Sequence, residues 1–163
     1  MNYARQTPHT LHTEHLASIG LLGRVEQALM RAPPRGAAPE TLMQALPALI
    51  QQIEHDVGRH FAFEENELFT RLSAAGEGNI AALLADEHEA IRSVADDLLP
   101  LLRGALAGTL DVPGWDALRR DTFELVERQV SHIQKEQMAL LPMLDDLLDE
   151  ATDDQLALAY AAA

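Results

Sequence analysis

The sequence contains no cysteine among its 163 residues. This absence excludes disulfide bonds, iron–sulfur clusters, cysteine-ligated zinc and thiolate catalysis by this chain. It also excludes the covalent haem attachment that uses a pair of cysteines. A metal ion bound by this chain must therefore take its ligands from histidine and carboxylate side chains.

Aromatic residues and positive charges are also scarce. Aromatic side chains make up 4% of the sequence, and 12 basic residues stand against 26 acidic ones, which gives a net charge of −14. A surface this acidic repels phosphate backbones and anionic lipids, so we expect neither nucleic acid nor membrane surfaces as partners. The acidic clusters at 145–150 and 153–154 are expected to be solvated helix faces.

Long apolar segments are missing as well. No apolar run approaches the ~20 residues that span a membrane, and the N-terminal sequence MNYARQTPHT lacks the apolar core of a signal peptide. We therefore expect a cytoplasmic protein.

What the sequence does contain is an apolar fraction of 47%, much of it Ala and Leu, which favours helices. At this length we expect one domain over residues 1–163. Proline and glycine divide the chain into long segments, which predict helices over about 10–31, 40–74, 79–107 and 115–148, followed by a short C-terminal helix. Such an order predicts an all-α, up-down-up-down four-helix bundle with its core at about 10–148.

Local signals suggest how the helices begin and end. Residues 33–36 (PPRG) are expected to stop the first helix, and Asn79 to cap the third. Pro100 predicts a kink or an interruption within the third helix. Thr152 and Gln155 have capping-box spacing for the short C-terminal helix.

Polar residues recur between the two halves of the chain. The repeated pairs are His60 and Glu64 with His132 and Glu136, 72 positions later, and Glu14-His15 with Glu87-His88, 73 positions later. The chain therefore reads as two helical hairpins related by pseudo-twofold symmetry, each supplying two histidines and one glutamate. An apolar core does not require polar residues to repeat in this way.

The spacing of the repeated pairs indicates a metal site. Residues four apart on a helix lie on one face, about 6 Å apart along the axis, so His60 and Glu64 can point at one centre. Burying both is costly unless they are hydrogen-bonded, paired or bound to metal. Six such groups exceed what one catalytic metal uses and fit two ions, with both glutamates bridging. The candidate ligands are His15, His60, Glu64, His88, His132 and Glu136. Iron, manganese and zinc all accept this ligand set.

Other readings of these residues stay open. A single His–Glu pair is often only a structural hydrogen bond, and a helical interaction module without metal would use the pairs in that way. His12 is either an additional ligand or supporting partner of the site, or a helix-start histidine, whereas His9 and His55 are expected to be exposed. Met138 is expected to fill the core. A ferritin-like oxidase is set aside, because no histidine here follows a glutamate by three positions.

Four segments together resemble the hemerythrin-like HHE cation-binding family over about residues 9–148. They are TEHLASIGLLGRVEQAL, HFAFEENELFTRL, DEHEAIRSVADDL and HIQKEQMALLPML. The resemblance implies a four-helix bundle around a carboxylate-bridged, non-haem centre of two iron ions, held by the same six side chains. It also implies that His15 and His60 share one metal, while His88 and His132 share the other.

Two positions depart from the oxygen-carrying hemerythrins. Arg92 stands where they have a further histidine, and Gln137 stands where they have an aspartate. The pattern is more similar to bacterial di-iron proteins linked to repair of iron centres after nitric oxide or oxidative stress. We therefore expect a di-iron protein that binds or reduces oxygen, nitric oxide or peroxide. The alternative is a non-catalytic module for oxygen or iron binding, sensing or metal handling, and whether the chain is an enzyme stays open.

Overall fold

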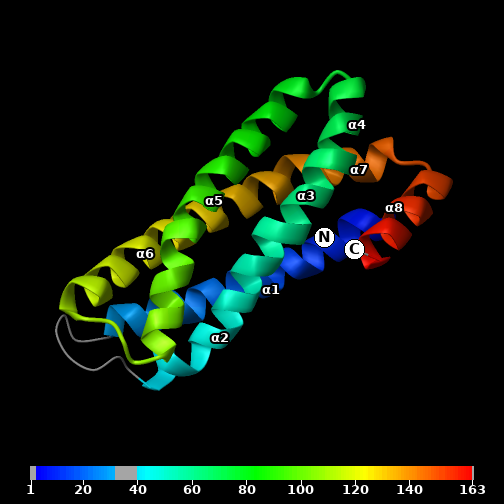
Figure 1. The fold of residues 1–163 in the computed structure, drawn as a ribbon. Coiled ribbons are helices and arrows are strands. Elements are labelled where there is room, and N and C mark those ends of the chain that lie inside the picture. The colour runs from blue at the N-terminus through cyan, green and yellow to red at the C-terminus, as the bar shows by residue number, and fades with distance from the viewer. Residues whose placement is uncertain (1–2, 32–39, 163) are drawn as a thin grey trace.

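The computed structural model describes residues 3–31 and 40–162, and these residues form helices joined by short turns (Figure 1). In chain order the elements are α1 (Gln6–Arg31), α2 (Glu40–His55), η1 (Asp56–His60), α3 (Phe61–Phe63), η2 (Glu64–Leu68), α4 (Phe69–Ala74), α5 (Gly78–Leu106), α6 (Val112–Lys135), η3 (Glu136–Leu140), α7 (Leu141–Leu147) and α8 (Glu150–Ala162). The η elements are π-helical turns within longer helices.

Four long helices build an antiparallel bundle, which confirms the predicted all-α fold (Figure 1). The second long helix runs from α2 to α4, and the fourth runs from α6 to α7. α1 and α5 each pack against both α2 and α6, and α8 folds back beside the start of α1. None of the helices in the described parts of the chain is long and apolar enough to cross a membrane.

Several helix ends differ from the sequence prediction. α1 begins at Gln6, and α5 begins at Gly78, so Asn79 lies inside α5 and is not its cap. α5 also continues through Pro100 without interruption, with the proline on its exposed face. α8 is capped by Asp149, whose carboxylate accepts a hydrogen bond from the amide of Thr152 at 2.8 Å. Residues 33–36, expected to end the first helix, lie outside the described residues.

The bundle interior contains two apolar clusters with a polar layer between them. The first cluster takes its buried side chains from the stretches 21–29, 42–61, 91–105 and 118–126. The second takes them from Leu11 and from 63–72, 81–84, 140–148 and 156–160. The four histidines and two glutamates singled out by the repeat are buried but belong to neither cluster. Met138 is 72% exposed, so its predicted place in the core is wrong. It lies two residues after the inward-facing Glu136, about 200° around the helix.

Asp153 attaches α8 to the start of α1. Its side chain is buried, which corrects the prediction that residues 153–154 form a solvated face. The carboxylate accepts hydrogen bonds from the amides of Gln6 at 2.6 Å and Thr7 at 2.9 Å. The first amides of a helix have no partner within the helix and carry its positive dipole end, so a carboxylate there is doubly favourable. A residue from the far end of the chain thus caps α1.

We expect Asp153→Ala to lower the free energy of unfolding by about 1–2 kcal/mol, the usual cost of losing a helix cap. Urea denaturation followed by circular dichroism measures the change. Asp154→Ala is the matched control, because its side chain is exposed on the same helix. Equal stabilities of the two variants would contradict the capping role.

Candidate metal centre

Three π-helical turns surround the polar layer. η1 ends at His60, η2 begins at Glu64 and η3 begins at Glu136. A π-turn bonds each carbonyl to the amide five residues ahead, is rare, and occurs mostly at functional sites. The two turns that begin at glutamates are 72 residues apart, so the symmetry seen in the sequence extends to the backbone.

All six side chains predicted to bind metal are buried in this layer and lie together. Their exposed fractions are His15 2%, His60 4%, Glu64 0%, His88 0%, His132 1% and Glu136 0%. They form two overlapping groups whose donor atoms lie within 4.8 Å of one another. One group is His15, His60, Glu64 and Glu136, and the other is Glu64, His88, His132 and Glu136. Both glutamates belong to both groups.

The histidines form two pairs that face each other through Nε2. The Nε2 atoms of His15 and His60 are 3.3 Å apart, and those of His88 and His132 are 2.9 Å apart. Phe61 supports the second pair, because its ring stacks on that of His88 with centroids 3.8 Å apart. The pairing therefore has an apolar wall that holds the imidazoles in place.

Glu64 connects the two histidine pairs. Its Oε1 lies 3.3 Å from Nε2 of His60, and its Oε2 lies 3.3 Å from Nε2 of His88. One carboxylate thus offers one oxygen to each pair. This is the arrangement that a bridging carboxylate requires.

Glu136 repeats the arrangement from the opposite hairpin. Its Oε2 lies 3.2 Å from Nε2 of His15, and its Oε1 lies 3.0 Å from Nε2 of His132. Although these contacts are short, none of the four carboxylate oxygens of Glu64 and Glu136 accepts a directed hydrogen bond. A buried carboxylate without donors is strongly unfavourable unless a cation lies beside it. The cluster could therefore hold metal, and its nitrogen and oxygen donors suit iron, manganese or zinc.

A known family now accounts for this geometry. The model of the hemerythrin HHE cation-binding domain matches residues 7–144. The chain belongs to this family. No curated protein matches the chain. The match confirms the resemblance seen in the four sequence segments. Helix α8 of this hemerythrin-like domain lies outside the matched range.

Carboxylates hold the outer nitrogens of three histidines in the hemerythrin-like centre. The Nδ1 contacts are His60 to Glu14 at 3.1 Å, His88 to Glu65 at 2.7 Å and His132 to Glu87 at 3.0 Å. A carboxylate at Nδ1 fixes the tautomer, so that Nε2 is free to bind a metal, and it makes the imidazole a stronger donor. By contrast, Nδ1 of His15 is buried without a partner.

Sequence reasoning did not assign these supporting glutamates, although a signal was present. Glu14 and Glu87 each precede the first histidine of a hairpin, and that pair is part of the repeat. Neighbouring residues on a helix point about 100° apart. Glu14 therefore faces His60 on the adjacent helix, and Glu87 likewise faces His132.

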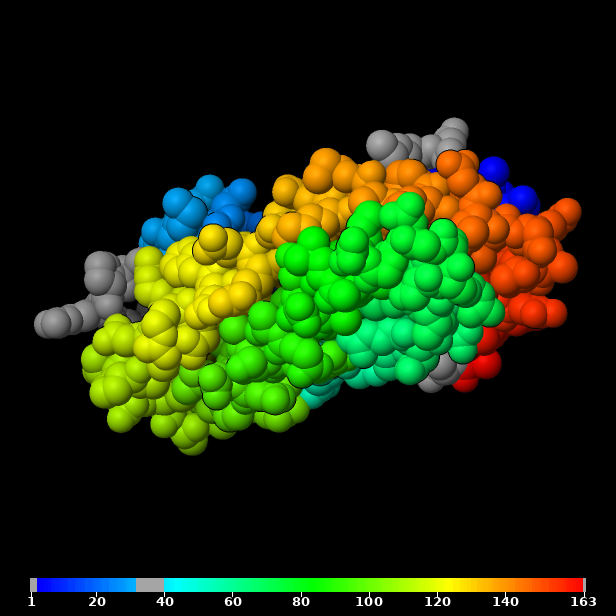
Figure 2. Space-filling view, turned by 90° about the horizontal axis from the view of Figure 1, so that it is seen from above, coloured from blue at the N-terminus to red at the C-terminus, as the bar shows by residue number. Residues whose placement is uncertain are grey.

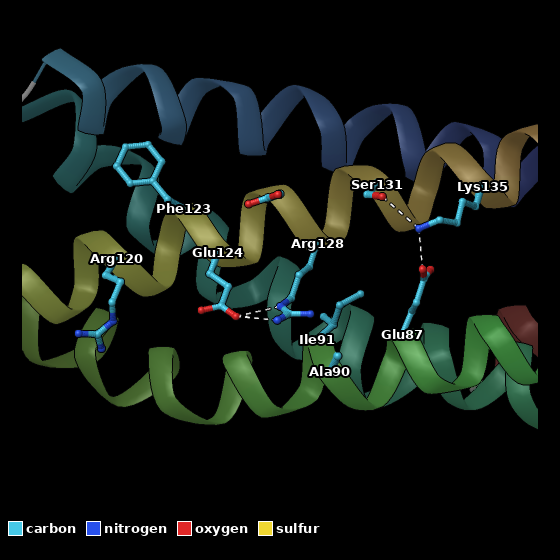
Figure 3. A pocket seen from close by; sticks show the side chains of 10 residues that line it. Glu87, Ala90, Ile91, Arg120, Phe123, Glu124, Arg128, Ser131 and Lys135 are labelled. Atoms are coloured by element: carbon cyan, nitrogen blue, oxygen red, sulfur yellow. Dashed lines mark hydrogen bonds and ion pairs between the residues drawn. The ribbon is translucent and has the colours of Figure 1, made fainter.

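Two of the supporting glutamates have a basic partner. Lys135 donates to Glu87 at 2.5 Å and also contacts Ser131, beside a groove of about 490 Å³ between α5 and α6 (Figure 3). Arg92 lies 2.8 Å from Glu65. The residue that replaces a histidine of the oxygen carriers thus neutralises the carboxylate behind His88. In the space-filling view, α5 (green) and α6 (yellow) lie side by side on the visible face (Figure 2).

The third supporting glutamate, Glu14, has a phenol as its partner. The hydroxyl of Tyr160, on α8, donates to Glu14 at 2.5 Å and lies 3.1 Å from Nδ1 of His60. Partial burial raises the pKa of Glu14, but hydrogen bonds from His60 and Tyr160 outweigh it and hold the pKa at about 2. Burial raises the pKa of Tyr160 above its usual value. The carboxylate therefore stays ionised and the phenol stays protonated at neutral pH.

Without metal, protons take the place of the cations. Burial alone would lower the pKa of His60, but the charge of Glu64 and the contacts with Glu14 and Glu64 together outweigh it and raise the pKa well above the usual value. Burial likewise opposes the charge on His132, yet Glu136 raises its pKa to about 9. Burial lowers the pKa of His15. In the metal-free centre the protonated forms of His60 and His132 are thus favoured beside the carboxylates, and binding a metal there would release protons.

The remaining three histidines lie outside the centre. His12 packs edge-on against Tyr3, with ring centroids 5.5 Å apart, and belongs to neither donor group. His9 is exposed. His55 is only partly exposed, and its Nε2 lies 3.6 Å from Oε2 of Glu14. The expectation of an exposed His55 is thus only partly right.

A buried carboxylate below the centre carries a measurable cost. Asp56 is 6% exposed and accepts hydrogen bonds from Gln52 at 2.7 Å and Gln129 at 2.9 Å. Burial raises its pKa from 3.8 to about 6, because two neutral amide donors do not replace the lost hydration. The folded state therefore disfavours ionised Asp56.

We expect Asp56→Asn to stabilise the metal-free protein above pH 6 and to have little effect below pH 4. At low pH the carboxyl is protonated in both states, so burial costs nothing. As the pH rises, the unfolded state ionises first and wild-type stability falls. The full cost is reached above the folded pKa and is about 3 kcal/mol for a shift of about two units.

Urea denaturation at several pH values measures this effect. Asp96→Asn, at an exposed position on α5, is the control and should show no such pH dependence. A stability difference between Asp56→Asn and wild type that is constant from pH 4 to pH 8 would contradict the interpretation.

Proposed function

We propose that the protein is a non-haem di-iron protein that binds or reduces a small oxidant, namely oxygen, nitric oxide or peroxide. One observation carries the proposal: Glu64 and Glu136 each present one oxygen to each histidine pair. His15 and His60 would hold one ion, His88 and His132 the other, and both glutamates would bridge them. Manganese or zinc in the same position remains an alternative that metal analysis decides.

The donor set leaves room for a ligand on each ion. Two imidazoles and two carboxylate oxygens make four protein donors per metal, and non-haem iron sites of this kind keep open positions. When bound, iron supplies the redox and Lewis-acid chemistry. The protein supplies orientation, through carboxylates behind three histidines, and it excludes bulk water, because the donors are 0–4% exposed. Such an enclosed site favours small diatomic or peroxidic ligands.

The replacement of a histidine by Arg92 supports reaction with an oxidant over oxygen carriage. In this chain Arg92 binds Glu65 and does not add a third imidazole to one metal. Both ions would then have the same number of protein donors and an open position each. Ferrous iron held by these residues would supply the electrons for reducing an oxidant, which fits a role in stress response or repair of iron centres.

Metal analysis tests the di-iron assignment. We expect protein from iron-replete cells to contain about two iron ions per chain, the stoichiometry of di-iron bundles. His60→Ala and His132→Ala should each lose most of this iron, because each removes an imidazole and leaves a bridging carboxylate unbalanced. His9→Ala, at an exposed position, should keep it. Full iron content in both ligand variants would leave the bundle purely structural.

Spectroscopy and turnover test the reaction. We expect the iron-loaded protein to show charge-transfer absorption that changes on addition of oxygen or nitric oxide, and to consume oxidant faster than free iron. A spectrum that responds without turnover above that of free iron would favour oxygen binding, sensing or metal handling. A spectrum that does not respond to either gas would overturn the proposal.

A further inference from the structure

A third group of metal-binding side chains lies at the surface, directly outside the centre. Oε2 of Glu14, Nε2 of His55 and Nδ1 of His60 lie within 4.8 Å of one another. We propose that these three donors form a loading position, at which a divalent transition-metal ion binds before it moves inward. The inference rests on the proposed function, because the loaded ion is the one that His15 and His60 would hold.

Exposure makes this group a path from solvent to the centre. The side chains of Glu14 and His55 are 32% and 31% exposed, whereas that of His60 is 5% exposed. The rings of His55 and His60 have their centroids 6.1 Å apart. An ion at Glu14 and His55 therefore already touches the ring whose other nitrogen points into the centre. The net charge of −14 concentrates cations at the protein surface and favours this encounter.

The pseudo-twofold symmetry indicates that a cation is missing beside Glu14. Its counterpart Glu87 has a resident ammonium group, that of Lys135, at 2.5 Å. The position equivalent to Lys135 in the first hairpin is Phe63, which packs in an apolar cluster. Among the described residues, no lysine or arginine forms an ion pair with Glu14; its partners are two histidines and a phenol.

Among the described residues, one arginine, Arg59, lines the adjacent cleft, and its guanidinium has other partners. The cleft measures about 160 Å³ and is lined by Glu14, Arg59 and Tyr160, among others. Arg59 donates to the main-chain carbonyl of Tyr160 and stacks over its ring at 4.6 Å. The carboxylate of Glu14 is partly exposed, so an ion from solution can reach it and would compete with the hydroxyl of Tyr160. Two imidazoles and one carboxylate suit Fe²⁺, Mn²⁺, Co²⁺ or Zn²⁺.

The two nitrogens of His60 make the loading position temporary. The ring offers Nδ1 to the loading position and Nε2 to the centre. With an ion held at Nε2 in the centre, Nδ1–H would donate a hydrogen bond to Glu14, which lies 3.1 Å away. The outer position then has lost one of its three donors, and a second ion binds there only weakly. The loading position therefore passes metal ions to the centre and does not store them.

The loading position is empty once the metal has reached the centre. It therefore affects the rates of metal uptake and release but not the affinity of the centre for metal. Whatever lowers the barrier to uptake lowers the barrier to release by the same amount. Removing the loading position should therefore slow metal uptake and metal release by the same factor. A residue that merely supports the fold of the centre would instead change the affinity.

Stopped-flow uptake of Co²⁺ by the metal-free full chain tests the proposal, because Co²⁺ bound by imidazole and carboxylate is visible by its absorption. We expect His55→Ala to slow uptake, and release to a chelator, each by about tenfold, a typical size for electrostatic steering. The final content should stay at about two Co²⁺ per chain. His55→Lys, which places a permanent cation beside Glu14 as Lys135 does beside Glu87, should slow both steps further.

His9→Ala is the control and should load at the wild-type rate, because this exposed histidine belongs to no donor group among the described residues. Wild-type rates in both His55 variants would overturn the loading position while leaving the di-metal centre intact. Weaker final affinity with an unchanged uptake rate would also overturn it, since His55 would then only support the centre. Failure of the wild-type protein to bind Co²⁺ would instead overturn the proposed function.

Discussion

The architecture of the bundle depends on two buried carboxylates, those of Glu64 and Glu136, whose oxygens accept no directed hydrogen bond. Glu64 and Glu136 lie at 0% exposure between two apolar clusters, and imidazole nitrogens lie 3.0–3.3 Å from their oxygens. An isolated arrangement of this kind costs several kcal/mol per charge. Protons on the histidines reduce this cost in the metal-free chain, and cations would remove it. The apolar clusters at either end supply the stability that lets the polar layer exist.

The two halves of the centre have the same candidate ligands, but the groups that contact the outer nitrogens of their histidines differ. Behind His88 and His132 lie carboxylates that are each neutralised by a basic side chain, Arg92 or Lys135. Behind His60 lies Glu14, which has a phenol partner, and His15 has no partner at Nδ1. On one side the supporting carboxylates therefore have a lysine or arginine partner, whereas on the other side the partly exposed Glu14 has two histidines and a phenol.

The sequence predicted the bundle and the grouping of polar residues better than it predicted their surroundings. Helix number and order follow from proline, glycine and helical periodicity, which are local. The spacing of His60 and Glu64 is local too. The contact of Glu14 with His60 depends on how two helices pack side by side, and that of Tyr160 depends on α8 docking onto α1 through Asp153. Neither packing arrangement has a signature within one helix, and for the same reason Asp153 was expected to be solvated.

The bridging arrangement has a consequence for how the molecule assembles. Each histidine pair comes from one hairpin, yet each pair also receives an oxygen from the glutamate of the other hairpin. Neither hairpin alone supplies all the side chains of either donor group. Folding of the two halves onto each other and binding of a metal would thus be linked equilibria.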